Sequence, residues 1–149
     1  MKKKYKIDFT NKNIVITGGF RNLGKCLVEA FLDLNANVIV VDKIIIKKKN
    51  SNKKLKFFKV DLSNSAEIEL FYKKLRKKKI IIDCLINNAS YNHIGILKNY
   101  IGKINDQDEL VFKSVVDINL IAPFILSKYL SKLMVKAKDP NIINVSSIY

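Results

Sequence analysis

Short apolar runs alternate with longer segments of helical periodicity along the chain. The apolar runs have strand length and are bounded by turn-forming residues, which predicts strands at residues 13–17, 38–42, 55–60, 80–86 and 141–146. The segments between them repeat apolar residues every three or four positions, which predicts helices at residues 23–34, 63–78 and 108–136. Such alternation is typical of an α/β protein with a parallel sheet wound on both faces and a ligand crevice at the strands' carboxyl ends.

The apolar positions also predict which sides of these elements are buried. Two helices present a single apolar stripe each, formed by Leu27, Ala30, Phe31 and Leu34 in the first and by Ile68, Phe71, Tyr72 and Leu75 in the second. The strand at 80–86 is nearly all apolar, as expected of a central strand that is buried on both faces. The helix at 108–136 is apolar on more than one side, which predicts contact with the sheet and with a further partner.

Length and composition indicate one packed domain. The 149 residues are 48% hydrophobic, and we expect a single domain over residues 1–149. The longest uninterrupted apolar run, residues 120–126, is far shorter than a bilayer span, and no apolar signal core follows the basic start. We therefore expect a cytoplasmic protein without a membrane partner. Cys26 and Cys84 lack metal-ligand spacing, so we expect reduced packing residues and no metal site.

The formal net charge of +15 raises the question of nucleic-acid binding. Arg21 and Arg76 are the only arginines, whereas recognition of bases favours the bidentate guanidinium group. The lysines fall in predicted loops and at helix ends, and Lys, Ile and Asn are abundant along the whole chain. We interpret the charge as solvated surface and expect no specific nucleic-acid partner. Nonspecific, salt-sensitive binding of polyanions stays open as an alternative.

The most informative segment is residues 13–24, where an apolar strand runs through a glycine-bearing turn into a helical pattern. Glycine permits a tight turn and a close approach of the backbone to a phosphate, and the helix then points its unpaired N–H groups at the anion. Asp42 ends the second strand eighteen residues after Gly24, where a carboxylate can accept hydrogen bonds from an adenosine ribose. The segment therefore predicts a dinucleotide-binding site.

Five motifs in order along the chain resemble those of the compact branch of the short-chain dehydrogenase/reductase family. They are TGGFRNLG at 17–24, DL at 61–62, NNAS at 87–90, DIN at 117–119 and NVSS at 144–147. Two positions depart from the family pattern, because Asn22 replaces the second glycine of the loop and Ser90 replaces the last residue of NNAG. Asparagine tolerates positive φ, so we expect the turn to survive at Asn22. The longer branch of the family would have glycine in place of Arg21.

The resemblance implies a Rossmann-like NAD(P)-binding domain and hydride transfer between the nicotinamide and a small-molecule carbonyl or alcohol. It implies that Ser147 hydrogen-bonds the substrate carbonyl and that Asn119 holds a water in a proton relay. The Asp42 charge would repel a 2′-phosphate, which favours NAD, whereas Arg21 and Lys43 favour NADP. The implied cofactor-binding residues are Gly18, Arg21, Asn22, Leu23, Gly24, Asp42, Asp61, Leu62, Asn88 and Ala89.

The family's catalytic tyrosine and lysine follow the serine on a helix that lies beyond Tyr149. The chain thus resembles the amino-terminal part of such an enzyme, and we expect a domain truncated after its fifth strand and inactive by itself. The fifth strand would then be an open sheet edge, and the outer apolar side of helix 108–136 would face water. In the full-length form we expect a homo-oligomer. The alternative is a non-catalytic dinucleotide-binding pseudoenzyme.

The substrate is the least readable property of the chain. Residues 146–149 (SSIY) resemble the serine strand of members from bacterial surface-sugar and flagellin-modification pathways. This resemblance suggests a nucleotide-sugar or a related polyol. His93 falls in the loop that borders the expected pocket, and we interpret it as a solvated loop residue.

Overall fold

A five-stranded parallel sheet forms the centre of the protein. The computed structural model describes residues 7–44, 52–91 and 103–146. The strand order is β3-β2-β1-β4-β5, and every neighbouring pair is parallel. This confirms the predicted doubly wound α/β sheet. The strands are β1 (Asn13–Thr17), β2 (Asn37–Asp42), β3 (Leu55–Lys59), β4 (Cys84–Asn87) and β5 (Asn141–Asn144).

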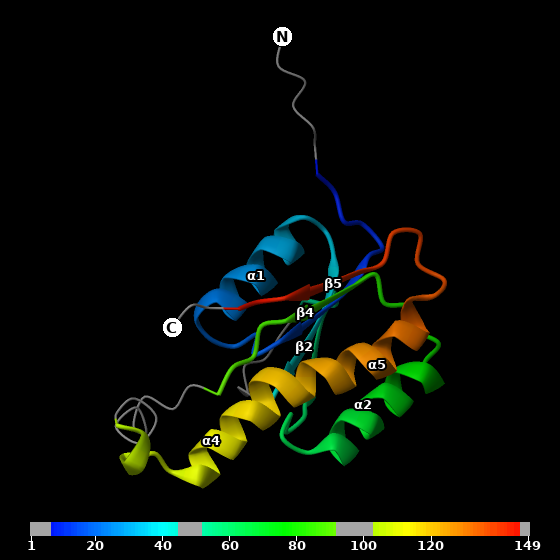
Figure 1. Ribbon diagram of the computed structural model, residues 1–149. Coiled ribbons are helices and arrows are strands. Elements are labelled where there is room, and N and C mark those ends of the chain that lie inside the picture. The colour runs from blue at the N-terminus through cyan, green and yellow to red at the C-terminus, as the bar shows by residue number, and fades with distance from the viewer. Residues whose placement is uncertain (1–6, 45–51, 92–102, 147–149) are drawn as a thin grey trace.

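Helices cover both faces of the sheet. Figure 1 shows α1 (Asn22–Asp33) on one face, and α2 (Ser65–Lys77) beside α5 (Ala122–Met134) on the other. A long helical segment precedes β5, with α4 (Glu109–Val116) joined to α5 through one π-helical stretch, η2 (Asp117–Ile121). A short 3₁₀ turn, η1 (Ile104–Asp106), lies ahead of α4.

The core consists of two apolar clusters, one on each face of the sheet. Successive residues of a strand point to opposite faces, so a strand buried on both sides must be apolar throughout. One cluster joins α1 to the sheet through Ile14, Ile16, Val28, Val38 and Val40. The other joins α2 and α5 to the opposite face through Val15, Ile39, Val41, Leu85, Ile68, Phe71, Leu75, Leu126 and Leu130.

The structure corrects three expectations about individual elements. The fourth strand begins at Cys84 and not at residue 80, because the amides of Ile80 and Ile82 donate to the carbonyls that end α2 and α5 and not to a neighbouring strand. On α1, Ala30 is exposed whereas Val28 is buried. Cys26 is exposed, so only the second cysteine is a packing residue.

The strand order creates a switch point between β1 and β4. The chain first moves from β1 outward through β2 to β3, and then returns past β1 to build β4 and β5 on its other side. In open α/β sheets the crevice for a ligand lies at the carboxyl ends of the strands beside such a reversal. The described residues of all five predicted motifs lie at this edge or lead to it.

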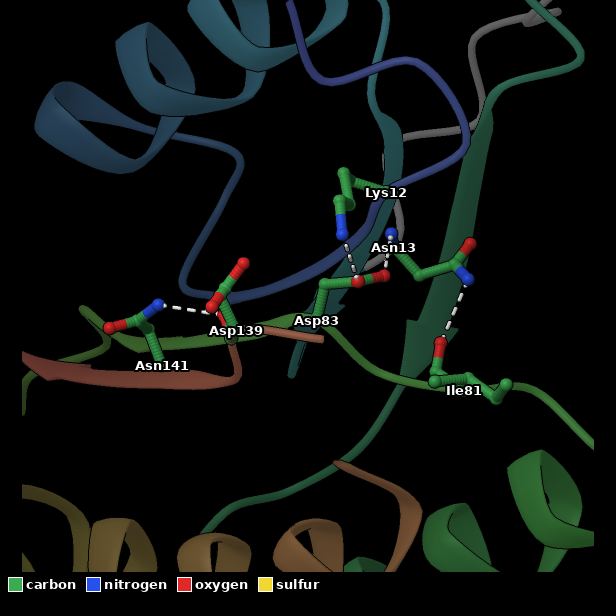
Figure 2. Close-up of polar contacts among 6 residues, drawn as sticks. All are labelled: Lys12, Asn13, Ile81, Asp83, Asp139 and Asn141. Atoms are coloured by element: carbon green, nitrogen blue, oxygen red, sulfur yellow. Dashed lines mark hydrogen bonds and ion pairs between the residues drawn. The ribbon is translucent and has the colours of Figure 1, made fainter. Parts of the chain in front are cut away.

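Ion-paired and hydrogen-bonded side chains lie at the opposite end of the sheet, where the strands begin (Figure 2). Asp83 accepts a hydrogen bond from Lys12 Nζ at 3.0 Å and another from the Asn13 amide at 2.9 Å. The Asn13 side chain donates to the Ile81 carbonyl at 2.8 Å. These contacts tie the start of β1 to the segment that enters β4, far from the predicted motifs, and their role is structural.

The last strand and the outer side of the long helix are exposed. Every residue of β5 is exposed, and Leu120 and Phe124 are 64% and 68% exposed on the helix. This confirms the expected open edge and the expected water-facing apolar side. By length and composition alone, Glu109–Met134 is a helix that would suffice to cross a membrane. Its inner side is nevertheless buried against α2 and the sheet, as in a core helix of an α/β domain.

Candidate functional site

The turn between β1 and α1 is built around two glycines that leave no room for a side chain. Gly18 has a φ of +67°, and a Cβ atom on it would lie 2.9 Å from Cα of Ala89. A Cβ atom on Gly24 would lie 2.1 Å from the Gly18 carbonyl oxygen and 2.6 Å from Nδ2 of Asn88. The first turn of α1 therefore packs directly on the ends of β1 and β4 only because both positions are glycine.

Asn22 replaces the missing second glycine of the loop without opening the turn. Its φ is +46°, in the left-handed region that asparagine tolerates better than most residues. This confirms that the turn survives the substitution. Phe20, two residues before Asn22, stacks on Phe57 of β3 with ring centroids 5.1 Å apart, which anchors the turn to the sheet.

The amino end of α1 is suited to an anion. Arg21 is the N-cap residue in extended conformation, and Arg21, Asn22 and Leu23 are all exposed. Among the residues that the structure describes, the N-cap side chain makes no capping hydrogen bond and the first turn holds no acidic residue. Helix ends of this kind offer main-chain N–H groups and a positive dipole end to a phosphate.

Thr17 and Asn88 lock the ends of β1 and β4 together beneath this turn. Thr17 Oγ1 accepts hydrogen bonds from the main-chain amides of Asn88 at 3.0 Å and Ala89 at 2.9 Å. The Asn88 side-chain amide donates to the Thr17 carbonyl at 3.0 Å and to the Gly18 carbonyl at 3.3 Å. Asn88 thus holds the turn in place. Thr17 begins the glycine motif and belongs to this arrangement, although the sequence motifs did not single it out as a site residue.

Asp42 lies at the carboxyl end of β2, on the strand next to β1. Its carboxylate oxygen Oδ1 accepts a hydrogen bond from the Ile44 amide at 3.2 Å, so the side chain also forms a local turn. The side chain is partly exposed and stands at the same sheet edge as Gly18 and Asn88. Its position fits a carboxylate that accepts hydrogen bonds from a ribose diol.

Asp61 follows β3 and is held by four polar groups. Its carboxylate pairs with Lys43 Nζ at 2.8 Å and accepts hydrogen bonds from the Ser63 amide at 3.0 Å and hydroxyl at 2.7 Å. Its own amide donates to Glu67 Oε2 at 2.8 Å. The hydrogen bonds from Lys43 and Ser63 hold the pKa of Asp61 below its ordinary value. The next residue, Leu62, buries its side chain in the core, so only its main chain is available to a ligand.

Asn119 lies in the π-helical stretch η2 and contacts the segment that leaves β4. Its Oδ1 accepts a hydrogen bond from the Tyr91 amide at 2.8 Å. Single π turns inside α-helices are frequent at functional sites, and Pro123, four residues on, has no N–H to donate to the preceding turn. The structure thus brings Asn119 to the end of β4, beside Tyr91, which directly follows the NNAS motif.

Ser147 lies outside the described residues, as do His93 and Tyr149. The strand before the serine stays paired with β4 up to Val145. The Val145 amide donates to the Asn87 carbonyl at 3.0 Å, which continues the hydrogen bonding between β4 and β5 past the end of β5. Asn87 is 4% exposed, and its Nδ2 donates to Asn144 Oδ1 at 2.8 Å. This amide pair fixes where the chain leaves the sheet toward residue 147.

The comparison with known proteins decides the family. A model of the short chain dehydrogenase family matches residues 12–149. The chain belongs to the short chain dehydrogenase family. The match covers the glycine turn, both acidic strand ends, the NNAS segment and the π-helical stretch, so the motifs identified in the sequence are those of a short chain dehydrogenase.

Individual short chain dehydrogenases are similar over nearly the whole chain. The 2-dehydro-3-deoxy-D-gluconate 5-dehydrogenase of Formosa agariphila is 29% identical and is matched by 95% of this chain. Among solved structures, a short chain dehydrogenase of Leptospira borgpetersenii with bound NAD⁺ is 28% identical, with a TM-score of 0.75 over 89% of this chain. A 4-hydroxyisoleucine dehydrogenase complexed with NADH is 32% identical, with a TM-score of 0.76 over 93% of this chain.

The chain spans about half the length of the relatives that it matches. It covers 54% of the Formosa enzyme, 50% of the Leptospira protein and 56% of the 4-hydroxyisoleucine dehydrogenase. The shared part runs from β1 through β5. It comprises the glycine turn and the carboxyl ends of all five strands of this short chain dehydrogenase domain.

Proposed function

We propose that this protein is an oxidoreductase that binds a nicotinamide dinucleotide and transfers hydride between it and a carbonyl or alcohol group. The observation that carries the proposal is the packing of Gly24 on the Gly18 carbonyl and Asn88, which brings the amino end of α1 against the ends of β1 and β4. A dinucleotide pyrophosphate would accept hydrogen bonds from the main-chain N–H groups there. When bound, the nicotinamide ring carries the hydride.

We propose NAD as the preferred dinucleotide. The Asp42 carboxylate would accept hydrogen bonds from the free ribose diol of NAD and would repel the 2′-phosphate of NADP. The Leptospira relative carries NAD⁺ and the 4-hydroxyisoleucine dehydrogenase carries NADH, whereas another structure of the same fold holds NADP, so the proposal of NAD rests on Asp42. Arg21, which is exposed in the turn, and Lys43 are the residues that favour NADP.

We propose Asn119 and Ser147 as the residues of this chain that act in catalysis. In the roles that the family implies, Asn119 holds a water of the proton relay and Ser147 donates a hydrogen bond to the substrate carbonyl oxygen. The contact between Asn119 and the Tyr91 amide supports a position beside the nicotinamide end of the site. The family's proton donor is a tyrosine assisted by a lysine after the serine, and we expect residues 1–149 alone to bind dinucleotide without turnover.

We propose a small polar, hydroxylated compound as the substrate. The Formosa relative is named for a sugar acid and another relative for a hydroxy amino acid, and both are of this chemical class. A role in surface-sugar biosynthesis is a narrower form of the same proposal, and it rests on the resemblance of residues 146–149. We also propose a homo-oligomer for the full-length protein, because the exposed apolar side of the long helix favours burial against another subunit.

Dinucleotide binding to the purified protein tests the proposal. Calorimetric or fluorescence titration with NADH and NADPH should give saturable binding that favours NADH. Asp42→Ala should weaken NADH binding roughly tenfold, because it removes hydrogen bonds between a charged acceptor and the ribose. Asp139→Ala, which removes a carboxylate at the opposite sheet edge, should leave the affinity unchanged. A folded protein that binds neither dinucleotide would contradict the proposal.

A further inference from the structure

The ion pair between Lys43 and Asp61 lies at the edge of the sheet that carries the proposed dinucleotide site. Lys43 directly follows Asp42 at the end of β2, and Asp61 follows the adjacent strand β3. Lys43 Nζ lies 2.8 Å from Asp61 Oδ2, although the lysine side chain is 71% exposed and could otherwise move freely in water. The ion pair therefore holds the Lys43 ammonium group beside Asp61. Lys43 is the residue next to Asp42, the carboxylate that we propose binds the ribose.

Asp61 is the rigid partner in this pair. Its other carboxylate oxygen accepts two hydrogen bonds from Ser63, and its amide donates to Glu67, so its position does not depend on the lysine. The pKa of Asp61 is lowered chiefly by Lys43, and the pKa of Lys43 is raised by Asp61. Both groups are thus charged at neutral pH, and each neutralises the other locally.

A free lysine at this position would have a different effect on cofactor choice. A 2′-phosphate carries up to two negative charges, and lysine or arginine side chains are the groups that recognise phosphates in proteins. With Lys43 engaged by Asp61, the charge that Asp42 presents toward the ribose is not offset. Without Asp61, the ammonium group would be available to offset it and to attract a phosphate.

We infer that Asp61 determines the preference for NAD over NADP by engaging Lys43, which is a latent phosphate-binding residue. The inference rests on the proposed function and adds a specificity determinant to it. It differs from a direct role of Asp61 toward adenine, because adenine is common to both dinucleotides. Loss of an adenine contact would weaken NADH and NADPH equally and would leave the ratio of their dissociation constants unchanged.

The ratio of the NADPH to the NADH dissociation constant tests the inference in the wild type, Asp61→Asn and the double variant Asp61→Asn/Lys43→Gln. Asparagine still offers an oxygen to Ser63, so the turn after β3 is retained. In Asp61→Asn the ratio of the NADPH to the NADH dissociation constant should fall roughly fivefold. This is the effect on binding expected of one solvent-exposed pair of opposite charges at about 4 Å. In the double variant the ratio should return to the wild-type value, because the cation is gone.

Asp83→Asn is the matched control, since it removes a carboxylate from the Lys12–Asp83 pair at the opposite edge of the sheet (Figure 2). Its ratio should equal that of the wild type. The inference would be overturned if the Asp61→Asn ratio stayed within twofold of the wild-type ratio, or if a lowered ratio persisted in the double variant. In either case, NADH binding by the wild type would still uphold the proposed function. A folded wild type that binds neither dinucleotide would overturn both.

Discussion

Replacing Gly24 by alanine places a methyl group where the fold has no space for one. The added Cβ would lie 2.1 Å from the Gly18 carbonyl oxygen and 2.9 Å from the carbonyl carbon, and neither main-chain atom can rotate away. Overpacking costs about 1–3 kcal/mol, whereas alanine gains up to about 1 kcal/mol over glycine inside a helix. Because the clash is with backbone, we expect a net loss of about 2 kcal/mol in the free energy of unfolding.

Urea unfolding followed by circular dichroism measures this loss. With a urea dependence of about 2 kcal/mol per molar, the midpoint of Gly24→Ala should fall by about 1 M. NADH affinity should fall roughly tenfold, because the amino end of α1 must move away from the strand ends. Gly19→Ala is the matched control, since its Cβ would meet methyl groups of Val40 and Val28, which can shift, and its loss should be smaller. An unchanged midpoint with unchanged NADH affinity in Gly24→Ala would refute the reasoning.

Two further predictions concern ionisable groups. Burial raises the pKa of the Cys84 thiol to about 11, whereas Cys26 is exposed. A thiol reagent at about pH 8 should therefore modify Cys26 rapidly and Cys84 only after denaturation. Rapid modification of both cysteines in the folded protein would contradict this packing. Because hydrogen bonds lower the pKa of Asp61 in the folded state, its contribution to stability is present above its ordinary pKa of 3.8 and is lost as the pH falls through the lower folded value. The difference in unfolding free energy between the wild type and Asp61→Asn should accordingly be constant above about pH 5 and shrink below it, and a difference that grows on acidification would have the wrong sign.

The errors of the sequence analysis have a common physical cause. Residues 80–83 have the apolar character of a strand, but the amides of Ile80 and Ile82 donate to carbonyls of α2 and α5, so they form a connection in which Ile82 is buried and Ile81 is exposed. Periodicity placed Ala30 inside and overlooked Val28, because the side of α1 closest to the sheet is the one that carries Gly24, and Val28 lies one helical turn after it. In both cases the pattern identified an apolar segment, but the neighbours that decide which of its residues are buried were unknown.

The sequence by itself determined the succession of elements and the chemistry at their ends. Strands buried on both faces must be apolar, and a turn that accepts a phosphate must contain glycine. Local pattern alone therefore predicted β1, β2 and the Gly18–Gly24 turn. Even the positive φ of Asn22 followed from the intrinsic tolerance of asparagine.

Only the tertiary structure decided which groups meet across the sheet. The hydrogen bonds of Asn88 to Thr17 and Gly18 join positions seventy or more residues apart, and no local pattern encodes them. The same is true of the pair that Lys43 forms with Asp61, which exists because parallel strands β2 and β3 end side by side. Local propensity specifies what a segment can become, whereas the partner of a polar side chain depends on strand order and register, which the packing of the whole chain selects.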